Sequence, residues 1–198
     1  MTTSSKTIVV LFSGRGSNLN AILEAQETGT IASGRVGLAL TNNPQAGGLS
    51  HASAAGVPTA VINHRDFPNR VSFDRALMGR IDAAAPDLVV LAGFMRILSA
   101  EFCEHYAGRL INTHPSLLPA FPGAHAIADA LAAGVDETGC TVHWVTAEVD
   151  AGPVIAQRRV SVQPGDTQAE VEKRILAQEH QLLPETIEAI CSGAVAYR

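Results

Sequence analysis

Two side chains that can stabilise and move charge follow a short apolar run near the middle of the chain. Asn112 and His114 come directly after Leu110 and Ile111, with Thr113 between them. Because side chains alternate along an extended segment, the amide and the imidazole are expected on the same face. Such a pair can hold a carbonyl oxygen that becomes an oxyanion, and the imidazole can transfer protons near neutral pH. The alternative is a structural pair, in which Asn112 caps the loop and His114 donates to a backbone carbonyl.

A carboxylate that can serve the same site lies in the segment EVDAGP, at residues 148–153. An acid beside His114 would orient the imidazole, favour its charged form and help to organise a water molecule. Asp150 also suits a tight turn before Gly-Pro, which is the structural alternative. Glu148 is expected to be a solvated neighbour. His143 is interpreted as a hydrogen-bonded structural histidine, although its strand can also turn it toward the site.

A glycine-rich turn, SGRGSN at residues 13–18, follows the first apolar run and precedes a segment with helical spacing. Glycines let the backbone turn tightly, and free N–H groups at a helix N-terminus attract anions. Leu19 stands where a dinucleotide fingerprint needs its third glycine, and no Gly-Lys-Ser/Thr makes a P-loop. The turn therefore predicts either a small phosphate-bearing ligand held by Gly16, Ser17 and Asn18, or an ordinary glycine turn with Ser17 as a helix cap.

Strand-like and helix-like segments alternate along the chain, which indicates an α/β fold with a mainly parallel central sheet flanked by helices. The strands are expected at residues 7–12, 36–40, 59–62, 88–92, 109–111, 141–145 and 154–162. One helix is expected to begin at Ser17, and the others to cover residues 49–55, 70–84, 98–106, 126–133 and 167–192. The last two strands lie too close together for a helical crossover, so the C-terminal part of the sheet is expected to be antiparallel. In such a sheet residues 13–18, 93–98 and 112–122 should meet beyond the strands' carboxyl ends.

The composition is that of an ordinary globular protein. The 198 residues, 46% hydrophobic and 17% charged, fit a single Rossmann-like domain over residues 1–198. A formal net charge of −5 argues against a nucleic-acid partner. The three cysteines are far apart, so neither a disulfide framework nor a metal site is expected. No segment resembles a signal peptide or is long enough to span a bilayer, so a cytoplasmic protein with no membrane partner is expected.

Four motifs together resemble those of the phosphoribosylglycinamide formyltransferases, the folate-dependent enzymes of purine synthesis. The motifs are SGRGSN, AGFMRIL, NTHPSLLPAFPG and EVDAGPV, and they occur in order over nearly the whole chain, with AQEH at residues 177–180 in the last helix. The resemblance implies the formyltransferase fold and transfer of a formyl group from 10-formyltetrahydrofolate, as cosubstrate, to the amine of glycinamide ribonucleotide. It implies no metal, these two small molecules as partners, and a monomer or a homodimer.

The resemblance also assigns roles residue by residue. Asn112, His114 and Asp150 match the catalytic trio of the family. Gly16, Ser17 and Asn18 match the loop that holds the ribonucleotide phosphate, and Glu179 matches the part that contacts the glycinamide side. The folate pocket is matched by Met95, Arg96, Ile97, Leu98, Asn112, Thr146, Ala147, Glu148, Val149 and Asp150. Arg70 aligns with a residue near the folate tail, where a solvated arginine on a helix face is the alternative.

The catalytic trio indicates the class of reaction better than the substrate, because related formyl transferases use the same three groups. A methionyl-tRNA formyltransferase carries a further nucleic-acid-binding domain and positive charge, and a formyltetrahydrofolate deformylase carries an N-terminal regulatory domain. Neither is expected here, with a net charge of −5 and a first strand at residue 7. The alternatives kept are another folate-dependent formyl transferase or formyltetrahydrofolate hydrolase, and a non-catalytic folate- or nucleotide-binding module.

Overall fold

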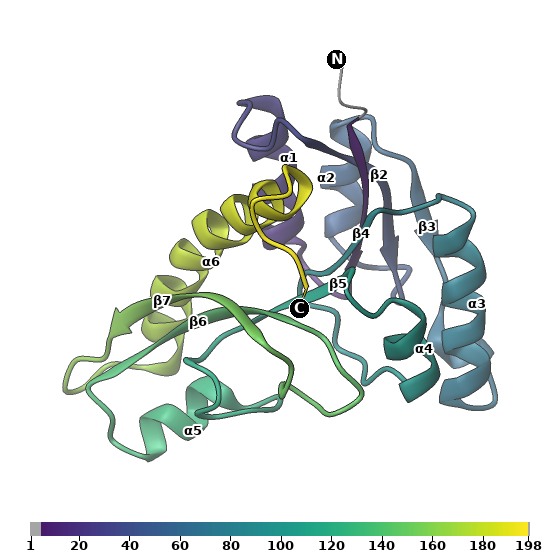
Figure 1. The fold of residues 1–198 in the computed structure, drawn as a ribbon. Helices are drawn as coiled ribbons and strands as arrows, with labels where there is room; N and C mark the ends of the chain where they lie inside the picture. The colour runs from purple at the N-terminus through teal and green to yellow at the C-terminus, as the bar shows by residue number, and fades with distance from the viewer. Residues whose placement is uncertain (1–4, 198) are drawn as a thin grey trace.

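A seven-stranded sheet forms the centre of the computed structural model, which describes residues 5–197 (Figure 1). The strands, in sequence order, are β1 (Lys6–Phe12), β2 (Gly34–Thr41), β3 (Thr59–Val61), β4 (Leu88–Leu91), β5 (Leu110–His114), β6 (Glu137–Trp144) and β7 (Val154–Ser161). The helices are α1 (Ser17–Glu27), α2 (Gly48–Ala54), the 3₁₀ turn η1 (His64–Asp66), α3 (Arg70–Asp82), α4 (Ala100–His105), α5 (Ala126–Ala132) and α6 (Gln168–Cys191).

The sheet is mixed, and its spatial order is β3-β2-β1-β4-β5-β6-β7. Strands β1 to β5 pair in parallel, whereas β6 runs antiparallel to both of its neighbours, β5 and β7. This confirms the α/β fold with a mainly parallel sheet and an antiparallel C-terminal part. The antiparallel part includes one pair more than expected, because β6 also pairs with β5.

Strand β1 shows why the sheet is covered on both faces. Its apolar run has no polar alternation, so side chains of both orientations must be buried. Ile8, Val10 and Phe12 belong to one core, which they share with α1 and α6, whereas Val9 and Leu11 belong to the second core with α3 and α4. The helices therefore lie in two layers on either side of the sheet (Figure 1).

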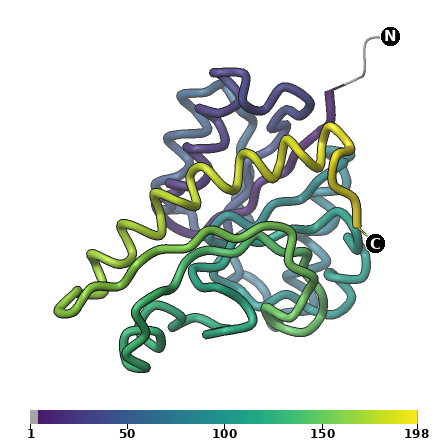
Figure 2. The backbone as a smooth tube through the Cα atoms, turned by 60° about the vertical axis from the view of Figure 1, so that its left-hand side comes forward, coloured from purple at the N-terminus to yellow at the C-terminus, as the bar shows by residue number. Residues whose placement is uncertain are grey.

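Helix α6 crosses the molecule beside α1 and the antiparallel strands, as Figure 2 shows. It begins with a capping box, in which the Thr167 hydroxyl accepts from Glu170 N–H and the Glu170 carboxylate accepts from Thr167 N–H. Caps of this kind contribute about 1 kcal/mol to helix stability. Leu183 and Ile187 bury the inner face of the helix in the first core. This docking fixes the position of Glu179, a residue of the candidate site.

Some element boundaries differ from those expected. Strand β5 continues to His114 rather than ending at Ile111, and β6 begins at Glu137 rather than near Thr141. Pairing between the two strands accounts for both extensions, because Asn112 pairs with His143 and His114 pairs with Thr141. The helix expected at residues 98–106 is shorter, since the Ser99 hydroxyl caps α4 by accepting from Phe102 N–H.

Candidate active site

The carboxyl ends of three parallel strands are tied together by the side chain of Ser13, which follows β1. Its hydroxyl donates to Asn42 Oδ1 at 2.6 Å, beyond β2, and accepts from Met95 N–H at 2.8 Å, beyond β4. The Ser13 N–H also donates to the Gly93 carbonyl at 3.1 Å. Residues 13–18 and 93–98 therefore meet at this edge of the sheet, as expected, and Thr113 and Pro115 of the third expected segment line the same cleft.

The glycine loop between β1 and α1 is closely packed against the start of α2. Gly16 has φ +75°, and a Cβ placed there would lie 2.5 Å from Gly48 Cα. Only glycine fits both the positive φ and this backbone approach. Gly16 is the N-cap residue of α1, without a side-chain cap, so the expectation of Ser17 as the cap is wrong and Ser17 is the first helical residue. Because no side chain closes this end, the backbone N–H groups of the first turn face an open site.

Strand β5 places its polar side chains on two faces of the sheet. Thr113 donates to Glu179 Oε1 at 2.9 Å, on the side of α6. Asn112 and His114 face the other way, toward His143 and Asp150 respectively. The alternation of a strand thus puts the amide and imidazole on one face, as expected, and directs Thr113 to the other.

His114 and Asp150 approach each other in a largely buried place. The distance between His114 Nδ1 and Asp150 Oδ2 is 3.4 Å, and His114 Nε2 donates to the Phe121 carbonyl at 2.9 Å. Asp150 has φ +53° and its Oδ2 also accepts from Gly123 N–H at 2.8 Å. Each imidazole nitrogen of His114 therefore faces an oxygen atom. The three groups of the expected trio are therefore adjacent, although they come from separate parts of the chain.

His143, interpreted from the sequence as a structural histidine, lies within the candidate site. It lies on β6 directly opposite Asn112, with its Nε2 3.2 Å from Asn112 Nδ2 and 3.6 Å from Asp150 Oδ1. Burial lowers the pKa of His143, although the Trp144 carbonyl and Asp150 act in the opposite direction. Knowing that residues 141–145 pair with residues 109–114 would have predicted this contact. The register between two strands that are distant in sequence cannot be predicted from either segment alone.

On the other face of β5, Glu179 forms a buried polar cluster with Asn18 and Thr113. Glu179 accepts from Asn18 Nδ2 at 3.1 Å and from Thr113 Oγ1 at 2.9 Å, and only 4% of it is exposed. Burial raises the pKa of the Glu179 carboxyl, while the two hydrogen bonds oppose that shift. The Asn18 Oδ1 atom is buried and has no hydrogen-bond partner among the described residues. This orphan acceptor indicates that a ligand donor belongs at the start of α1.

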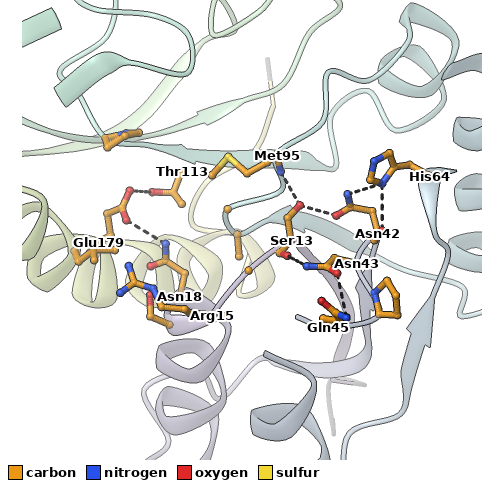
Figure 3. A pocket seen from close by; sticks show the side chains of 18 of the residues that line it. Ser13, Arg15, Asn18, Asn42, Asn43, Gln45, His64, Met95, Thr113 and Glu179 are labelled. Atoms are coloured by element: carbon orange, nitrogen blue, oxygen red, sulfur yellow. Dashed lines mark hydrogen bonds between the residues drawn. The ribbon is translucent and has the colours of Figure 1, made fainter. Parts of the chain in front are cut away.

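A cleft of about 720 Å³ lies between the glycine loop, α6 and the carboxyl ends of β1, β2 and β4, with side chains from all of these pointing into it (Figure 3). Gly16, Ser17, Asn18 and Glu179 line it, so the residues expected to bind the ribonucleotide share one cavity, which also includes Met95, expected in the folate pocket. The cleft also contains residues that the sequence did not single out, among them Asn42 and His64. Asn42 Nδ2 lies 3.2 Å from His64 Nδ1.

The residues expected to bind folate are more dispersed. Met95 and Ile97 are exposed, with 73% and 61% of their surface accessible. Val149, the residue before Asp150, is exposed as well. Leu98 instead packs in the second hydrophobic core. Arg70 is exposed and begins α3, and it does not line the cleft. Arg96 and residues 146–150 also lie outside that cavity.

Comparison with known proteins identifies the family. Residues 6–187 match the sequence model described as formyl transferase. This chain belongs to the formyl transferase family. Phosphoribosylglycinamide formyltransferase of Escherichia coli (strain K12) is 48% identical to this formyl transferase over 186 residues, which make up 94% of this chain and 87% of that protein. The trifunctional purine biosynthetic protein adenosine-3 of Homo sapiens is 43% identical over 188 residues, which make up 95% of this chain and 18% of that longer protein.

Solved structures agree with this assignment. Glycinamide ribonucleotide transformylase 1 from Symbiobacterium toebii is 44% identical to this formyl transferase, with a TM-score of 0.95 over 98% of this chain and 91% of that one. Formyl transferases of this family use a folate-derived formyl donor. Within residues 5–197, no group of three or more histidine, cysteine or acidic side chains is placed to hold a metal ion. No helix of the same residues is long and apolar enough to cross a membrane.

Proposed function

We propose that this formyl transferase moves the formyl group of 10-formyltetrahydrofolate to the amine of 5′-phosphoribosylglycinamide, in purine biosynthesis. The products are formylglycinamide ribonucleotide and tetrahydrofolate. The observation that carries the proposal is the approach of Asp150 Oδ2 to His114 Nδ1, at 3.4 Å, beside the amide of Asn112. The names of the relatives, which are transformylases of this ribonucleotide, support the choice of substrate.

The reaction needs charge stabilisation and one proton transfer. The amine nitrogen of the ribonucleotide attacks the formyl carbon, and the carbonyl electron pair moves to oxygen to give a tetrahedral oxyanion. The oxyanion then collapses, the bond between carbon and the folate nitrogen breaks, and the proton lost by the amine goes to that leaving nitrogen. No electrons leave the two substrates, so no oxidant is required.

Asn112 and His114 are proposed as the donors to the oxyanion. The Asn112 amide uses one N–H toward His143 and has a second one free for the ligand. His114 Nε2 now donates to the Phe121 carbonyl, and in the complex the substrate oxygen would take over that hydrogen bond. A donor of this kind typically contributes about 3 kcal/mol to transition-state stabilisation. Asp150 is proposed to orient the imidazole and to hold the water that relays the proton.

The two substrates are proposed to approach the end of β5 from opposite faces. The ribonucleotide would occupy the cleft of about 720 Å³, with its phosphate at Gly16, Ser17 and Asn18 and its glycinamide side near Glu179. The folate would lie beside Asn112 and Asp150. Its pocket would be formed by Met95, Arg96, Ile97, Leu98, Thr146, Ala147, Glu148 and Val149, with Arg70 near its tail. Thr113 points to the opposite face of β5 from Asn112 and His114, so each face has its own polar groups. This alternation supports the two-sided arrangement.

The wider setting follows from the same proposal. We propose one formyltransferase domain over residues 1–198, acting in the cytoplasm as a monomer or a homodimer. Its partners would be the two small molecules, with no nucleic acid, membrane or metal involved.

One experiment tests the proposed activity directly. The purified protein is mixed with glycinamide ribonucleotide and 10-formyltetrahydrofolate, and the deformylated folate is followed by its absorbance while the ribonucleotide product is identified by mass. Formation of formylated ribonucleotide in equal amount to tetrahydrofolate is expected. Release of formate without a formylated product would indicate a hydrolase, formylation of a different amine would indicate another transferase, and folate binding without turnover would indicate a binding module. Each of these three results contradicts the proposal.

A further inference from the structure

Arg15 is the one residue of the glycine loop whose side chain has no assigned role. It lies between Gly14 and Gly16 and lines the cleft, and its Nη2 lies 3.2 Å from Glu172 Oε1 on α6. Figure 3 places the Arg15 side chain next to Asn18, at the start of α1. A side chain of the loop thus reaches toward the facing helix above the place where the first turn of α1 leaves its N–H groups open.

Stability does not account for this ion pair. The Arg15 side chain is 82% exposed and that of Glu172 is 42% exposed. Pairs this exposed gain little Coulomb energy and lose side-chain entropy, so they contribute between nothing and about 1 kcal/mol. The pair uses one N–H of a guanidinium that carries five. Four donors therefore remain for a ligand while Glu172 holds the planar group in place.

The formal charges that line the cleft favour a cation near the start of α1. Four side chains with a formal charge line it: Arg15, Arg65, Glu172 and Glu179. Both carboxylates lie on α6, so a doubly charged phosphate at the start of α1 would be repelled from that side. Helix α1 offsets this with about half a positive charge from its dipole. The Arg15 guanidinium supplies a full charge and neutralises Glu172 at the same time.

A second observation points to a ligand at the same place. The buried Asn18 Oδ1 atom lacks a partner, and Asn18 lines the cleft one helical position after Ser17. A phosphate alone cannot satisfy this acceptor, whereas a phosphorylated sugar offers hydroxyl donors next to its anionic group. A single sugar phosphate therefore fits all three groups. Its hydroxyls match the acceptor Asn18 Oδ1, and its phosphate matches the N–H groups of α1 and the Arg15 guanidinium.

We propose that Arg15 is a phosphate-binding arm of this enzyme, held in position by Glu172, which donates to the phosphate of the ribonucleotide together with the N–H groups at the start of α1. This inference rests on the proposed function, since it takes the ribonucleotide as the ligand of the cleft. Guanidinium is suited to the task because its planar fork matches the geometry of two phosphate oxygens. Glu172 is a positioning residue in this arrangement and makes no contact with the ligand.

The test measures the contribution of the phosphate to binding separately from that of the rest of the ligand. The dissociation constant of glycinamide ribonucleotide, and of the same compound without its phosphate, is measured by calorimetry in the absence of folate. Arg15→Ala is expected to weaken binding of the ribonucleotide about 10- to 100-fold, as for a lost charge-assisted hydrogen-bonded contact. It should change binding of the dephosphorylated compound and the KM for folate by less than about twofold. Arg15→Lys should recover part of the loss, because it keeps the charge but not the fork.

Two further variants serve as controls. Glu172→Gln removes the carboxylate and keeps a hydrogen-bonding amide, so its effect on ribonucleotide binding should be several-fold smaller than that of Arg15→Ala. Arg35→Ala removes the same charge from exposed Arg35 on β2, and binding should not change. Equal losses in Arg15→Ala and Glu172→Gln, or an equal loss with the dephosphorylated compound, would overturn the inference. Formyl transfer by the wild-type protein is scored separately, so a failure of the proposed function is distinguished from a failure of this inference.

Discussion

His143 fixes the orientation of the Asn112 side chain. Its Nδ1 lies 2.9 Å from the Trp144 carbonyl oxygen, which can only accept, so Nδ1 carries the proton of the neutral ring. Nε2 of that ring is then an acceptor, 3.2 Å from Asn112 Nδ2. The amide nitrogen is thereby directed toward β6. A histidine outside the expected trio thus sets the direction of one of the proposed oxyanion donors.

Acidification should remove this contact together with some stability. Burial lowers the pKa of His143, so folding favours the neutral ring and its contribution to stability is complete above the ordinary histidine pKa of about 6.5. As the pH falls from that value through the lowered pKa, the contribution is lost. His143→Asn keeps an acceptor and does not titrate, so its free energy of unfolding in urea should fall less steeply below about pH 6.5. His125→Asn, at an exposed position, should retain the wild-type slope, and identical slopes in all three proteins would contradict the prediction.

Glu179 should have the opposite pH dependence. Its pKa is raised by burial, so folding favours the protonated carboxyl, and the corresponding stability is complete below the ordinary pKa and lost as the pH rises through the raised one. Glu179→Gln does not titrate. Its free energy of unfolding, relative to wild type, should therefore increase as the pH rises above the ordinary glutamate pKa of about 4.3. Glu104→Gln, on the exposed face of α4, should follow the wild type across this range, and a pH-independent difference for Glu179→Gln would refute the assignment.

Two glycines of the glycine loop, Gly14 and Gly16, should respond differently to the same substitution. Gly16→Ala forces a Cβ to within 2.5 Å of Gly48 Cα at φ +75°, so we expect a loss of about 2 kcal/mol or more in unfolding free energy and a higher KM for the ribonucleotide. Gly14→Ala places its Cβ where nothing lies within 4 Å, and its stability should stay within about 0.5 kcal/mol of wild type. Chemical denaturation of the two variants measures both values. Similar losses in the two variants would show that the close approach of Gly16 to Gly48 is unimportant.

The proposed catalytic trio should act mainly on turnover. His114→Ala and Asp150→Ala are each expected to lower kcat by a factor of about 10² to 10⁴, because they remove a proton-transfer group and its partner. For His114→Ala, which is outside the proposed folate pocket, folate affinity measured by fluorescence titration should stay near the wild-type value. Asp150→Asn tolerates the positive φ and keeps an acceptor for Gly123 N–H, so it tests the charge without disturbing the turn. Unchanged turnover in both alanine variants would end the mechanistic proposal.

The sequence by itself determined which segments form the sheet and where the polar loops follow its strands. The unbroken apolar run of β1 required burial on both faces, and the alternation of Asn112, Thr113 and His114 fixed which of these side chains share a face. Both patterns are local, so they can be read without knowing what lies opposite. The same reasoning placed the glycine loop before α1 and Asp150 in the turn after β6.

Only the tertiary structure decided which distant groups touch. The ladder between β5 and β6 extended both strands and brought His143 onto Asn112, and the docking of α6 brought Glu172 to Arg15 and Glu179 to Asn18. Such contacts depend on strand register and on how helices pack over a sheet. These are set by the burial of many apolar side chains at once, and no single segment of the chain encodes them.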